Sequence, residues 1–421
     1  MREMKDSGIS WVGEIPKEWS VWRNKYIFKI TKDIVLPSQN YQLLSLTTTG
    51  IKEKDENDNG GKVPENYDGY QIVKENDLVM CLFDLDCSAV FSGLSPYNGM
   101  ISPAYKVLKV KKRIANEQYY RYWFNYVGSK RFYKQYSKSL RFTLNADEFN
   151  RLFSLLPPLD EQQRIAEFLD RECGKIDGLK ADIQAQIDTL EQYKRSVITE
   201  AVTHGLNPSA PMKDSKVWYG QISSEWKELK GKYVFKQRND RGNNVCLQLL
   251  SPTQKYGVIP QDKYEELTGM NAVKLNYSTN YALLKTIHKG DYCISLRSFQ
   301  GGFEYSEYEG VVSPAYQVFY PIITIADGYY KYLFKEKGFI DVMNSYTMSL
   351  RDGKNIAFDD FGDTFIPVPP LDEQQEIADY LDNKCAEIEQ IIADKKSQIE
   401  TLDGYKKSLI YEYVTGKKEV V

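Results

Sequence analysis

The residues closest to a catalytic motif are two proline pairs, Pro157-Pro158 and Pro369-Pro370. Adenine methylation needs an aromatic-proline clamp in which Asn or Asp precedes the prolines, but Leu156 and Val368 stand there. A phosphate-binding loop of the form G-x-x-x-x-G-K-S/T is absent, and Gly301-Gly302 is interpreted as a turn. No carboxylate cluster with a following Lys is suited to hold Mg²⁺ for DNA hydrolysis. The sequence therefore predicts no catalytic site.

Cysteine and histidine, which are common zinc ligands, are too dispersed for a metal site. No C-x-x-C pair occurs, so the sequence predicts neither a disulfide framework nor a zinc site. We interpret the cysteines as core residues. These residues are Cys81, Cys87, Cys173, Cys246, Cys293 and Cys385, with His204 and His288 as the histidines.

The composition is typical of a soluble protein with several domains. A chain of 421 residues has room for more than one core, because a single core rarely grows beyond about 250 to 300 residues. Apolar runs such as Leu78–Phe83 are far shorter than the roughly 20 residues of a membrane span. The first residues lead into Asp6, Gly8 and Ser10, so we expect no signal peptide and a cytoplasmic location.

The basic residues are concentrated in one stretch, although the net charge of the chain is -3. That net charge alone argues against a nucleic-acid binder. Between Lys106 and Arg141, however, Lys and Arg recur with Glu117 as the one acid, and aromatic residues stand among them. Two interpretations remain open, a solvated surface helix and a surface that meets a polyanion.

An internal repeat sets the architecture. The segment 157–163 returns identically as 369–375, and 102–105 returns as 313–316. The tryptophan frame at the start of each half is also shared, whereas 45–63 and 251–262 are unlike. The frame comprises Trp11, Gly13, Ile15 and Trp19, which match Trp218, Gly220, Ile222 and Trp226.

Each half combines an α+β domain with a long helix. Alternating residues predict strands over 104–110 and 316–322, and aromatic stretches predict helices from Glu117 and Asp327. We place the globular domains at 1–156 and 206–368 and the long helices at 157–205 and 369–421. The predicted fold is thus α+β, with two pseudo-symmetric domains and two long helices.

A heptad pattern marks the long helices. Capping boxes at Asp160 with Gln163 and at Asp372 with Gln375 predict their starts, and Gly205 and Gly416 their ends. A seven-residue apolar seam needs a partner, so we expect an antiparallel coiled coil of the two copies. In the second seam Lys395 replaces an apolar residue, and we interpret it as a snorkelling side chain. The seams are Leu169, Ile176, Ile183, Leu190 and Val197, joined by Leu179 and Tyr193, and Leu381, Ile388, Lys395, Leu402 and Leu409, with Ile391 and Tyr405.

These motifs resemble the specificity subunit of type I restriction-modification systems over essentially the whole chain. The segment 8–19 is similar to that family's opening, and 205–208 leading to 212–215 is similar to its link into the second half. The Pro-Pro-Leu-Asp-Glu-Gln-Gln boxes resemble its junctions between a target-recognition domain and a constant helix. The segment 221–224 departs from the family's usual Glu-Ile-Pro.

The resemblance implies a non-catalytic subunit that binds double-stranded DNA with a split target, one half-site for each domain. It implies docking of two modification subunits, which carry S-adenosylmethionine, and of restriction subunits, which use ATP and Mg²⁺. We expect no cofactor in this chain and no membrane. The candidate subunit-binding residues are Pro157, Pro158, Leu159, Asp160, Pro369, Pro370, Leu371 and Asp372.

Candidate DNA contacts lie mainly where the halves differ, because Arg, Asn and Gln read base edges while Lys, Ser and Thr mostly hold phosphates. Arg297 aligns with Phe83 when the two halves of the repeat are compared, which favours a role of Arg297 in one half-site only. Arg141 and Arg351 stand in matching Ser-Leu-Arg triplets, so a shared phosphate or structural role is equally open. We interpret the aromatic stretch 119–126 as core in preference to a stacking platform. The candidates are Thr47, Thr48, Thr49, Lys52 and Arg141, and Thr253, Gln254, Lys255, Arg297 and Arg351.

Two other classes of protein remain possible. A self-sufficient DNA methyltransferase or nuclease would need the cofactor motif that the sequence lacks. A coiled-coil adapter without a nucleic-acid role would explain the long helices but would assign no function to the two differing globular domains.

Overall fold

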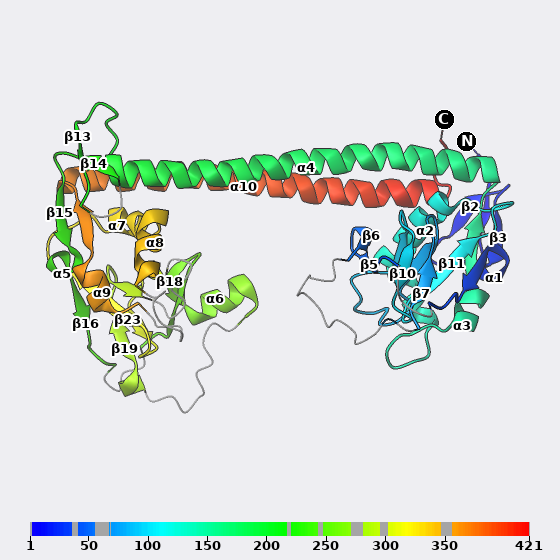
Figure 1. Cartoon of the computed structure of the whole chain (residues 1–421), viewed down its shortest axis with the longest axis horizontal. Coiled ribbons are helices and arrows are strands. Elements are labelled where there is room, and N and C mark those ends of the chain that lie inside the picture. Colours follow the sequence, from blue (N-terminus) through cyan, green and yellow to red (C-terminus); the bar gives the residue numbers. More distant parts are fainter. Residues whose placement is uncertain are drawn as a thin grey trace. The chain divides into compact units, whose positions relative to one another are not determined.

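The computed structural model describes residues 2–35, 41–54, 67, 69–216, 220–242, 247–270, 281–294, 302–346 and 356–420. The chain forms two compact units. The first unit comprises Met1–Ile183 and Lys396–Val421, and the second comprises Gln184–Lys395. Each unit contains one globular domain with parts of both long helices, α4 (Leu159–His204) and α10 (Leu371–Val414) (Figure 1).

The first globular domain is built from short antiparallel strands and a few helices. Its central sheet has the strand order β4-β11-β8-β9. Its strands are β1 (Met4–Asp6), β2 (Glu14–Pro16), β3 (Ser20–Arg23), β4 (Phe28–Thr31), β5 (Leu44–Thr47), β6 (Gly50–Glu53), β7 (Gln71–Val73), β8 (Leu78–Met80), β9 (Ser92–Leu94), β10 (Gly99–Ile101), β11 (Lys106–Val110) and β12 (Phe153–Leu156). Its helices are α1 (Asn24–Ile27), α2 (Glu117–Ser129), η1 (Phe132–Tyr136) and α3 (Ala146–Arg151).

The second globular domain repeats this topology. Its central sheet, β16-β23-β20-β21, has the same order, and the paired strands β13-β14, β15-β24, β17-β18 and β19-β22 match β1-β2, β3-β12, β5-β6 and β7-β10. The strands are β13 (Met212–Asp214), β14 (Gln221–Ser223), β15 (Lys227–Lys230), β16 (Phe235–Arg238), β17 (Leu250–Thr253), β18 (Gly257–Pro260), β19 (Lys285–Ile287), β20 (Tyr292–Ile294), β21 (Phe303–Tyr305), β22 (Gly310–Val312), β23 (Gln317–Pro321) and β24 (Phe365–Val368). The helices are α5 (Gly231–Val234), α6 (Gln261–Thr268), η2 (Tyr281–Leu283), α7 (Asp327–Leu333), α8 (Lys337–Ser345) and α9 (Phe358–Asp363). The predicted α+β class is confirmed.

The aromatic stretch packs inward from α2. Asn116 caps this helix by accepting a hydrogen bond from the backbone N–H of Tyr119, and Tyr119, Tyr120 and Trp123 are fully buried. The Tyr120 ring meets Phe28 of the central sheet at 4.8 Å between ring centroids. Burial of each such ring stabilises the fold by about 2 kcal/mol. The interpretation of these residues as core is confirmed.

The cysteines are not all core residues. Cys81, Cys173, Cys293 and Cys385 are buried, and burial raises the pKa of each thiol. Cys87 is exposed, so its assignment to the core was wrong. Cys246 lies outside the described residues.

The long helices begin without the predicted capping boxes. The first turn of each helix already includes Leu159 or Leu371, which directly follows a proline pair. The Gln163 amide donates to Glu167 Oε1 at 2.9 Å and does not reach back to the helix start. The neighbouring Gln162 makes a different contact, because its Nε2 donates to the Pro157 carbonyl at 2.8 Å. Past the helix ends, Gly205 and Gly416 have φ of 81° and 70°, a region that favours glycine.

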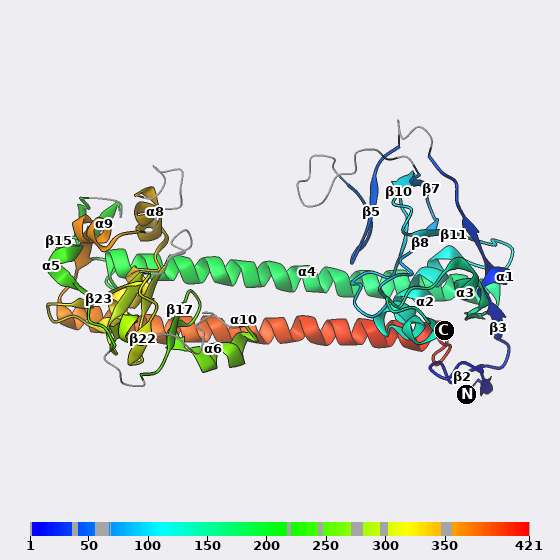
Figure 2. The same cartoon turned by 90° about the horizontal axis from the view of Figure 1, so that it is seen from below.

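The two long helices contact each other within each unit (Figure 2). In the first unit Lys406 Nζ lies 2.7 Å from Asp177 Oδ1, and Lys180 pairs with Asp403. In the second unit Lys194 pairs with Glu389, and Lys395 Nζ donates to Gln186 Oε1 at 2.5 Å. The polar end of Lys395 is thus hydrogen-bonded at the helix surface, as the snorkelling interpretation expects.

Four apolar residues assigned to the seams are exposed. Leu179 and Tyr193 of α4 are 53% and 48% exposed, and Ile391 and Tyr405 of α10 are 38% and 57% exposed. Ile187, which the heptad did not include, is buried instead. Within the described residues, no helix combines the length and the apolar character that crossing a membrane would require.

Candidate nucleic-acid interface

A buried glutamine fixes each globular domain to the start of the long helix that follows it. Gln162 accepts a hydrogen bond from the Asn116 N–H and donates to the Ile114 carbonyl, both at 2.9 Å. Gln374 likewise accepts from the Ala326 N–H at 3.0 Å and donates to the Pro369 carbonyl at 2.9 Å. Because a buried amide without partners is costly, these bonds define one geometry for each junction.

The repeated tryptophan at the start of each half binds the same helix turn. Trp19 Nε1 donates to Glu161 Oε2 at 2.9 Å, and Trp226 Nε1 donates to Glu373 Oε2 at 2.8 Å. In the first unit Arg2 adds a bidentate ion pair with Glu161. In the second unit burial raises the pKa of Glu373, although the Trp226 hydrogen bond opposes this shift.

A repeated tyrosine binds the far end of the other long helix. Tyr119 donates from its hydroxyl to the Val414 carbonyl at 2.9 Å, and Tyr329 donates to the Val202 carbonyl at 2.7 Å. Each globular domain therefore rests on the beginning of one long helix and the end of the other.

A second repeated tyrosine lies beside a helix carboxylate. The Tyr122 hydroxyl donates to Asp170 Oδ1 at 2.8 Å, and the Tyr332 hydroxyl donates to Asp382 Oδ1 at 2.6 Å. A cation, Arg121 or Lys331, pairs with the same carboxylate. Burial raises the pKa of both tyrosines, which keeps them protonated as donors. The residues shared by the two halves thus hold the domains on the helices.

The hairpins that differ between the halves present exposed polar side chains. At the β5–β6 turn the Thr47 hydroxyl donates to the Gly50 carbonyl at 2.7 Å. At the β17–β18 turn the Thr253 hydroxyl donates to the Gly257 carbonyl at 2.9 Å. Thr47 and Thr253 therefore shape their turns. The side chains left at the surface are those of Thr48, Thr49, Lys52, Gln254 and Lys255.

Each of these turns borders a cleft inside its own unit. The first cleft, of about 900 Å³, lies between Thr48, Thr49 and helix residues that include Lys180 and Lys406. The second, of about 550 Å³, lies between Gln254, Lys255 and helix residues that include Lys194. The shared pairs Tyr122–Asp170 and Tyr332–Asp382 line these clefts, so each cleft has one shared wall and one wall that differs between the halves.

The basic stretch divides into a paired part and an unpaired part. Lys109, Lys112 and Arg121 form ion pairs with Asp33, Glu117 and Asp170. In the part of the chain that the structure describes, no acidic partner contacts the cations of residues 130–142, which we call the basic loop. These cations are Lys130, Arg131, Lys134, Lys138 and Arg141.

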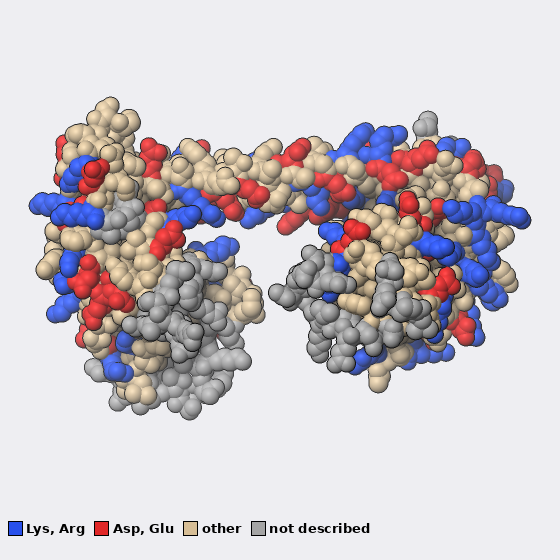
Figure 3. Space-filling model, viewed as in Figure 1, with Lys and Arg blue, Asp and Glu red and all other residues tan. Residues whose placement is uncertain are grey.

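The basic loop has a defined shape. The Thr143 N–H donates to the Ser139 hydroxyl at 2.7 Å, and the Asp84 N–H donates to the Arg141 carbonyl at 3.2 Å. Leu140 and Arg141 are exposed at the loop surface. On the face that Figure 3 shows, Lys and Arg stand among Asp and Glu in both units, so unpaired cations are more informative than total charge. The candidates Arg297 and Arg351 lie outside the described residues.

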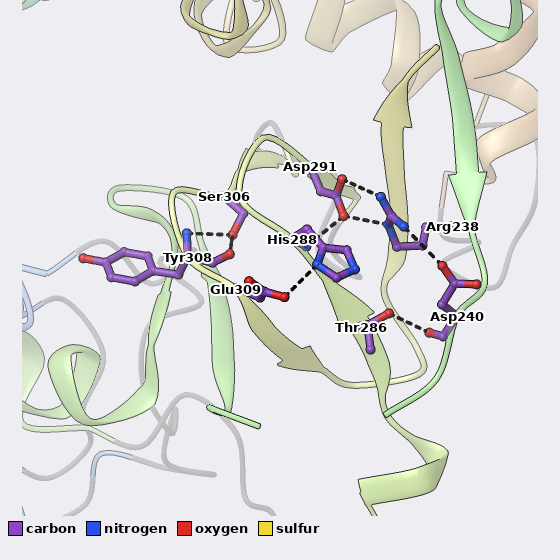
Figure 4. A network of polar contacts seen from close by, with 8 residues as sticks. All are labelled: Arg238, Asp240, Thr286, His288, Asp291, Ser306, Tyr308 and Glu309. Atoms are coloured by element: carbon purple, nitrogen blue, oxygen red, sulfur yellow. Dashed lines mark hydrogen bonds and ion pairs between the residues drawn. The ribbon is translucent and has the colours of Figure 1, made fainter. Parts of the chain in front are cut away.

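Arg238 is an arginine of the second domain that already has its partners (Figure 4). Its guanidinium donates to both carboxylate oxygens of Asp291, at 2.8 and 3.1 Å, and to Asp240 at 3.1 Å. The His288 N–H also donates to Asp291, at 2.9 Å. In the first domain Thr31 stands at the position of Arg238, so this network is specific to the second domain. Three hydrogen bonds to two carboxylates hold the guanidinium, which makes it a brace for the β19–β20 turn.

The candidate subunit-binding residues lie at the two junctions. Pro157 and Pro369 are buried, while the residues that follow them are exposed. Leu159 is 40% and Leu371 is 47% exposed, so both junctions present an apolar side chain at the surface. The exposed members are Pro158, Leu159, Asp160, Pro370, Leu371 and Asp372.

Residues 222–401 match the family described as type I restriction modification DNA specificity domain. The chain is 22% identical to a protein named as the MjaX specificity subunit of a type I restriction enzyme, from Methanocaldococcus jannaschii, over 97% of this chain and 96% of that protein. It is 27% identical to the MjaVIII specificity subunit of the same organism, over 39% of this chain and 36% of that protein.

Solved structures share the fold. A chain from a structure on complex assembly and conformational transition of the type I R-M system aligns with a TM-score of 0.68 and 13% identity, over 96% of this chain and 99% of that chain. The HsdS subunit from Thermoanaerobacter tengcongensis aligns with a TM-score of 0.51 and 13% identity, over 96% of this chain and 98% of that chain. These structures show that the fold is shared. Residues 222–401 are similar to the type I restriction modification DNA specificity domain, and nearly the whole chain is similar to the MjaX specificity subunit.

Proposed function

We propose that this chain is the non-catalytic subunit that reads a bipartite DNA sequence for a type I restriction-modification complex. The observation that carries the proposal is the contrast between the walls of the two clefts. Gln162 and Gln374 make matching contacts in the two units, whereas the turns that face the helices carry Thr48 and Thr49 in one and Gln254 and Lys255 in the other. A common frame with unlike exposed turns suits two domains that read different half-sites.

The basic loop supports contact with a polyanion. Its cations have no acidic partner in the described residues, so their charge is available to phosphates. Ser139 and the Arg141 carbonyl hold the loop in one shape, which lowers the entropy lost on binding. We therefore assign Lys134 and Lys138 to phosphate contacts of the first half-site and Arg141 to a phosphate or a base.

The helix contacts support an antiparallel coiled coil. Residue numbers rise on α4 as they fall on α10, from Asp177–Lys406 in the first unit to Lys194–Glu389 in the second. This order is what antiparallel helices require. Together with the crossed bonds of Tyr119 and Tyr329 it favours a pseudo-two-fold relation between the halves.

The exposed apolar residues of the long helices suit protein partners. Leu179 and Ile391 occupy matching positions of the repeat, as do Tyr193 and Tyr405, and all four are exposed. Matching apolar surfaces on both copies fit two identical partners. We assign these surfaces and the exposed junction residues to the modification subunits, which would bring S-adenosylmethionine. Restriction subunits with ATP and Mg²⁺ would join the same complex in the cytoplasm.

The direct test is selection of bound duplexes from a random library by the full chain together with its modification subunits. We expect two short conserved blocks separated by a gap of fixed length and free sequence. A coiled-coil adapter would enrich no sequence, and a self-sufficient enzyme would modify or cut the DNA without any added subunit.

A further inference from the structure

Glu304 of β21 is a buried carboxylate with one unused oxygen. Its side chain is only 2% exposed, and Lys335 Nζ lies 2.6 Å from Oε1. Oε2 has no hydrogen-bond partner. An ionised, partly satisfied carboxylate in the interior costs stability. A neutral side chain would therefore be the more stable choice at this position, which points to a functional reason for the charge.

The pair lies directly beneath the β17–β18 turn. Lys335 Nζ is 3.5 Å from the carbonyl oxygen of Gln254, at the exposed tip of that turn. Gly257, which closes the turn, packs on the Tyr305 carbonyl so closely that a Cβ there would lie 2.8 Å from the oxygen. Glu304, Lys335, Gln254 and Lys255 all line the second cleft.

The first domain supports its equivalent turn with apolar contacts. Gly93 of β9 corresponds to Glu304 by strand register. Gly93 pairs with a residue of β8, and Glu304 pairs with the equivalent residue of β20. A Cβ on Gly93 would lie 2.8 Å from Leu46 Cδ1, so Leu46 of the hairpin fills this space. The charge pair is thus confined to the second domain.

We propose that Glu304 and Lys335 form a charged support that holds the β17–β18 turn in the conformation that reads the second half-site. Glu304 acts as a positioning residue, because it is too buried to reach DNA itself. Its negative charge keeps the Lys335 ammonium under the Gln254 carbonyl, and the turn then presents Gln254 and Lys255 outward. This inference rests on the proposed function and names a determinant of one half-site.

The support should respond to pH near neutrality. Burial raises the pKa of Glu304 to about 7, against the opposing effect of Lys335. Among the described groups around it, the Cys293 thiol stays protonated because burial raises its pKa, and Lys331 and Asp382 form their own pair across the cleft. His288, on the β19–β20 turn, contacts Glu309 through Nδ1 at 3.0 Å.

The test compares the full chain in complex with its modification subunits with the variants Glu304→Gln and Glu307→Gln. Glu307 lines the same cleft and is exposed, so it is the matched control. Selection from duplexes with both half-sites randomised is run at pH 8.5 and pH 6. We expect Glu304→Gln to lower discrimination at the second half-site by about tenfold at pH 8.5. The first half-site and the Glu307→Gln control should be unchanged.

The pH profile separates a positioning role from a general structural one. The wild type should lose discrimination at the second half-site when the pH falls from 8.5 to 6. The discrimination of Glu304→Gln at that half-site should be low at both pH values and should not depend on pH. If Glu304→Gln does not fold, the wild-type profile alone decides, with the first half-site as the internal reference. Full discrimination in Glu304→Gln, or equal loss at both half-sites, would overturn the inference while the proposed function stands. Absence of any sequence preference in wild type would instead refute the proposed function.

Discussion

The basic loop offers the sharpest test of DNA contact in the first domain. We consider the combined substitution of Lys130, Lys134 and Lys138 by Gln. None of these lysines has an acidic partner in the described residues, and Lys134 has a ring contact with Phe142 at 4.5 Å. Loss of that contact costs about 1 kcal/mol or less, so the fold should persist.

The expected loss of affinity follows from counterion release. Each phosphate contact adds about 0.9 to the slope of log K against log salt, so three lost contacts should lower the slope by up to about 2.7. Between 50 and 200 mM salt, that change corresponds to a factor of about 40 in the ratio of affinities. The preferred bases should not change, because phosphate contacts position the protein without reading sequence.

The assay is a titration of labelled duplex by fluorescence anisotropy at several salt concentrations, with circular dichroism to verify folding. The matched control replaces Lys109 and Lys112, which already pair with Asp33 and Glu117 and should contribute little. If the control lowers the slope of log K against log salt as much as the triple variant does, ion pairing does not determine which lysines contact DNA. An unchanged slope in the folded triple variant would remove the basic loop from the interface.

Three further predictions concern stability and geometry. Gln162→Ala should lower the free energy of unfolding in urea by about 2 to 4 kcal/mol, because it leaves buried backbone groups without hydrogen-bond partners. The control Gln163→Ala loses one exposed hydrogen bond to a helix neighbour and should lower that free energy by less than about 0.5 kcal/mol. Equal losses would contradict the role of the junction glutamine. Because the pKa of Glu304 is raised from 4.5 to about 7 on folding, the wild type should gain stability as pH falls through 7 toward 4.5. Glu304→Gln should then be the more stable protein at pH 8, by up to about 3 kcal/mol, and a less stable variant would show that the ionised carboxylate is not costly. Adding one heptad after Ile183 and another after Lys395 preserves the apolar seam and lengthens each helix by roughly 10 Å. Library selection should then find a gap between the half-sites that is about three base pairs longer, with weaker binding because the longer duplex also turns the half-sites relative to each other. An unchanged gap in a folded protein would show that the helices do not set the distance between the half-sites.

The sequence predicted the elements that depend on local pattern. The proline pairs with the heptads located both long helices, and glycines with positive φ follow their ends. The choice of seam residues was less successful, since Leu179 is exposed and Ile187 is buried. The second buried position of the heptad lies four residues after the first, at Cys173, Ile187 and Ala201, whereas Leu179 and Tyr193 stand three residues after it.

The contacts that define the site depend on strand register and could not be derived from spacing. Glu304 meets Lys335, and Arg238 meets Asp291, only after the central sheet has formed. Glu304 alternates with Phe303 and Tyr305 in a short strand. This alternation is the usual pattern of a half-exposed strand, so the sequence did not indicate that Glu304 is buried. The predicted boundaries of the domains and the roles of the candidate DNA contacts stay predictions.

The bond from Tyr119 to the carbonyl of Val414 has a consequence for biosynthesis. A ribosome produces the first globular domain long before it reaches residues 396–421, yet these residues complete the first unit. The nascent first domain therefore keeps an uncovered surface until residues 396–421 have been translated, whereas the helix end that the second domain contacts, at Val202, is made before that domain. A prematurely terminated product would carry a finished second domain beside an unfinished first one. Such a product would be a substrate for chaperones and proteases and would not act as a subunit with half of its target specificity.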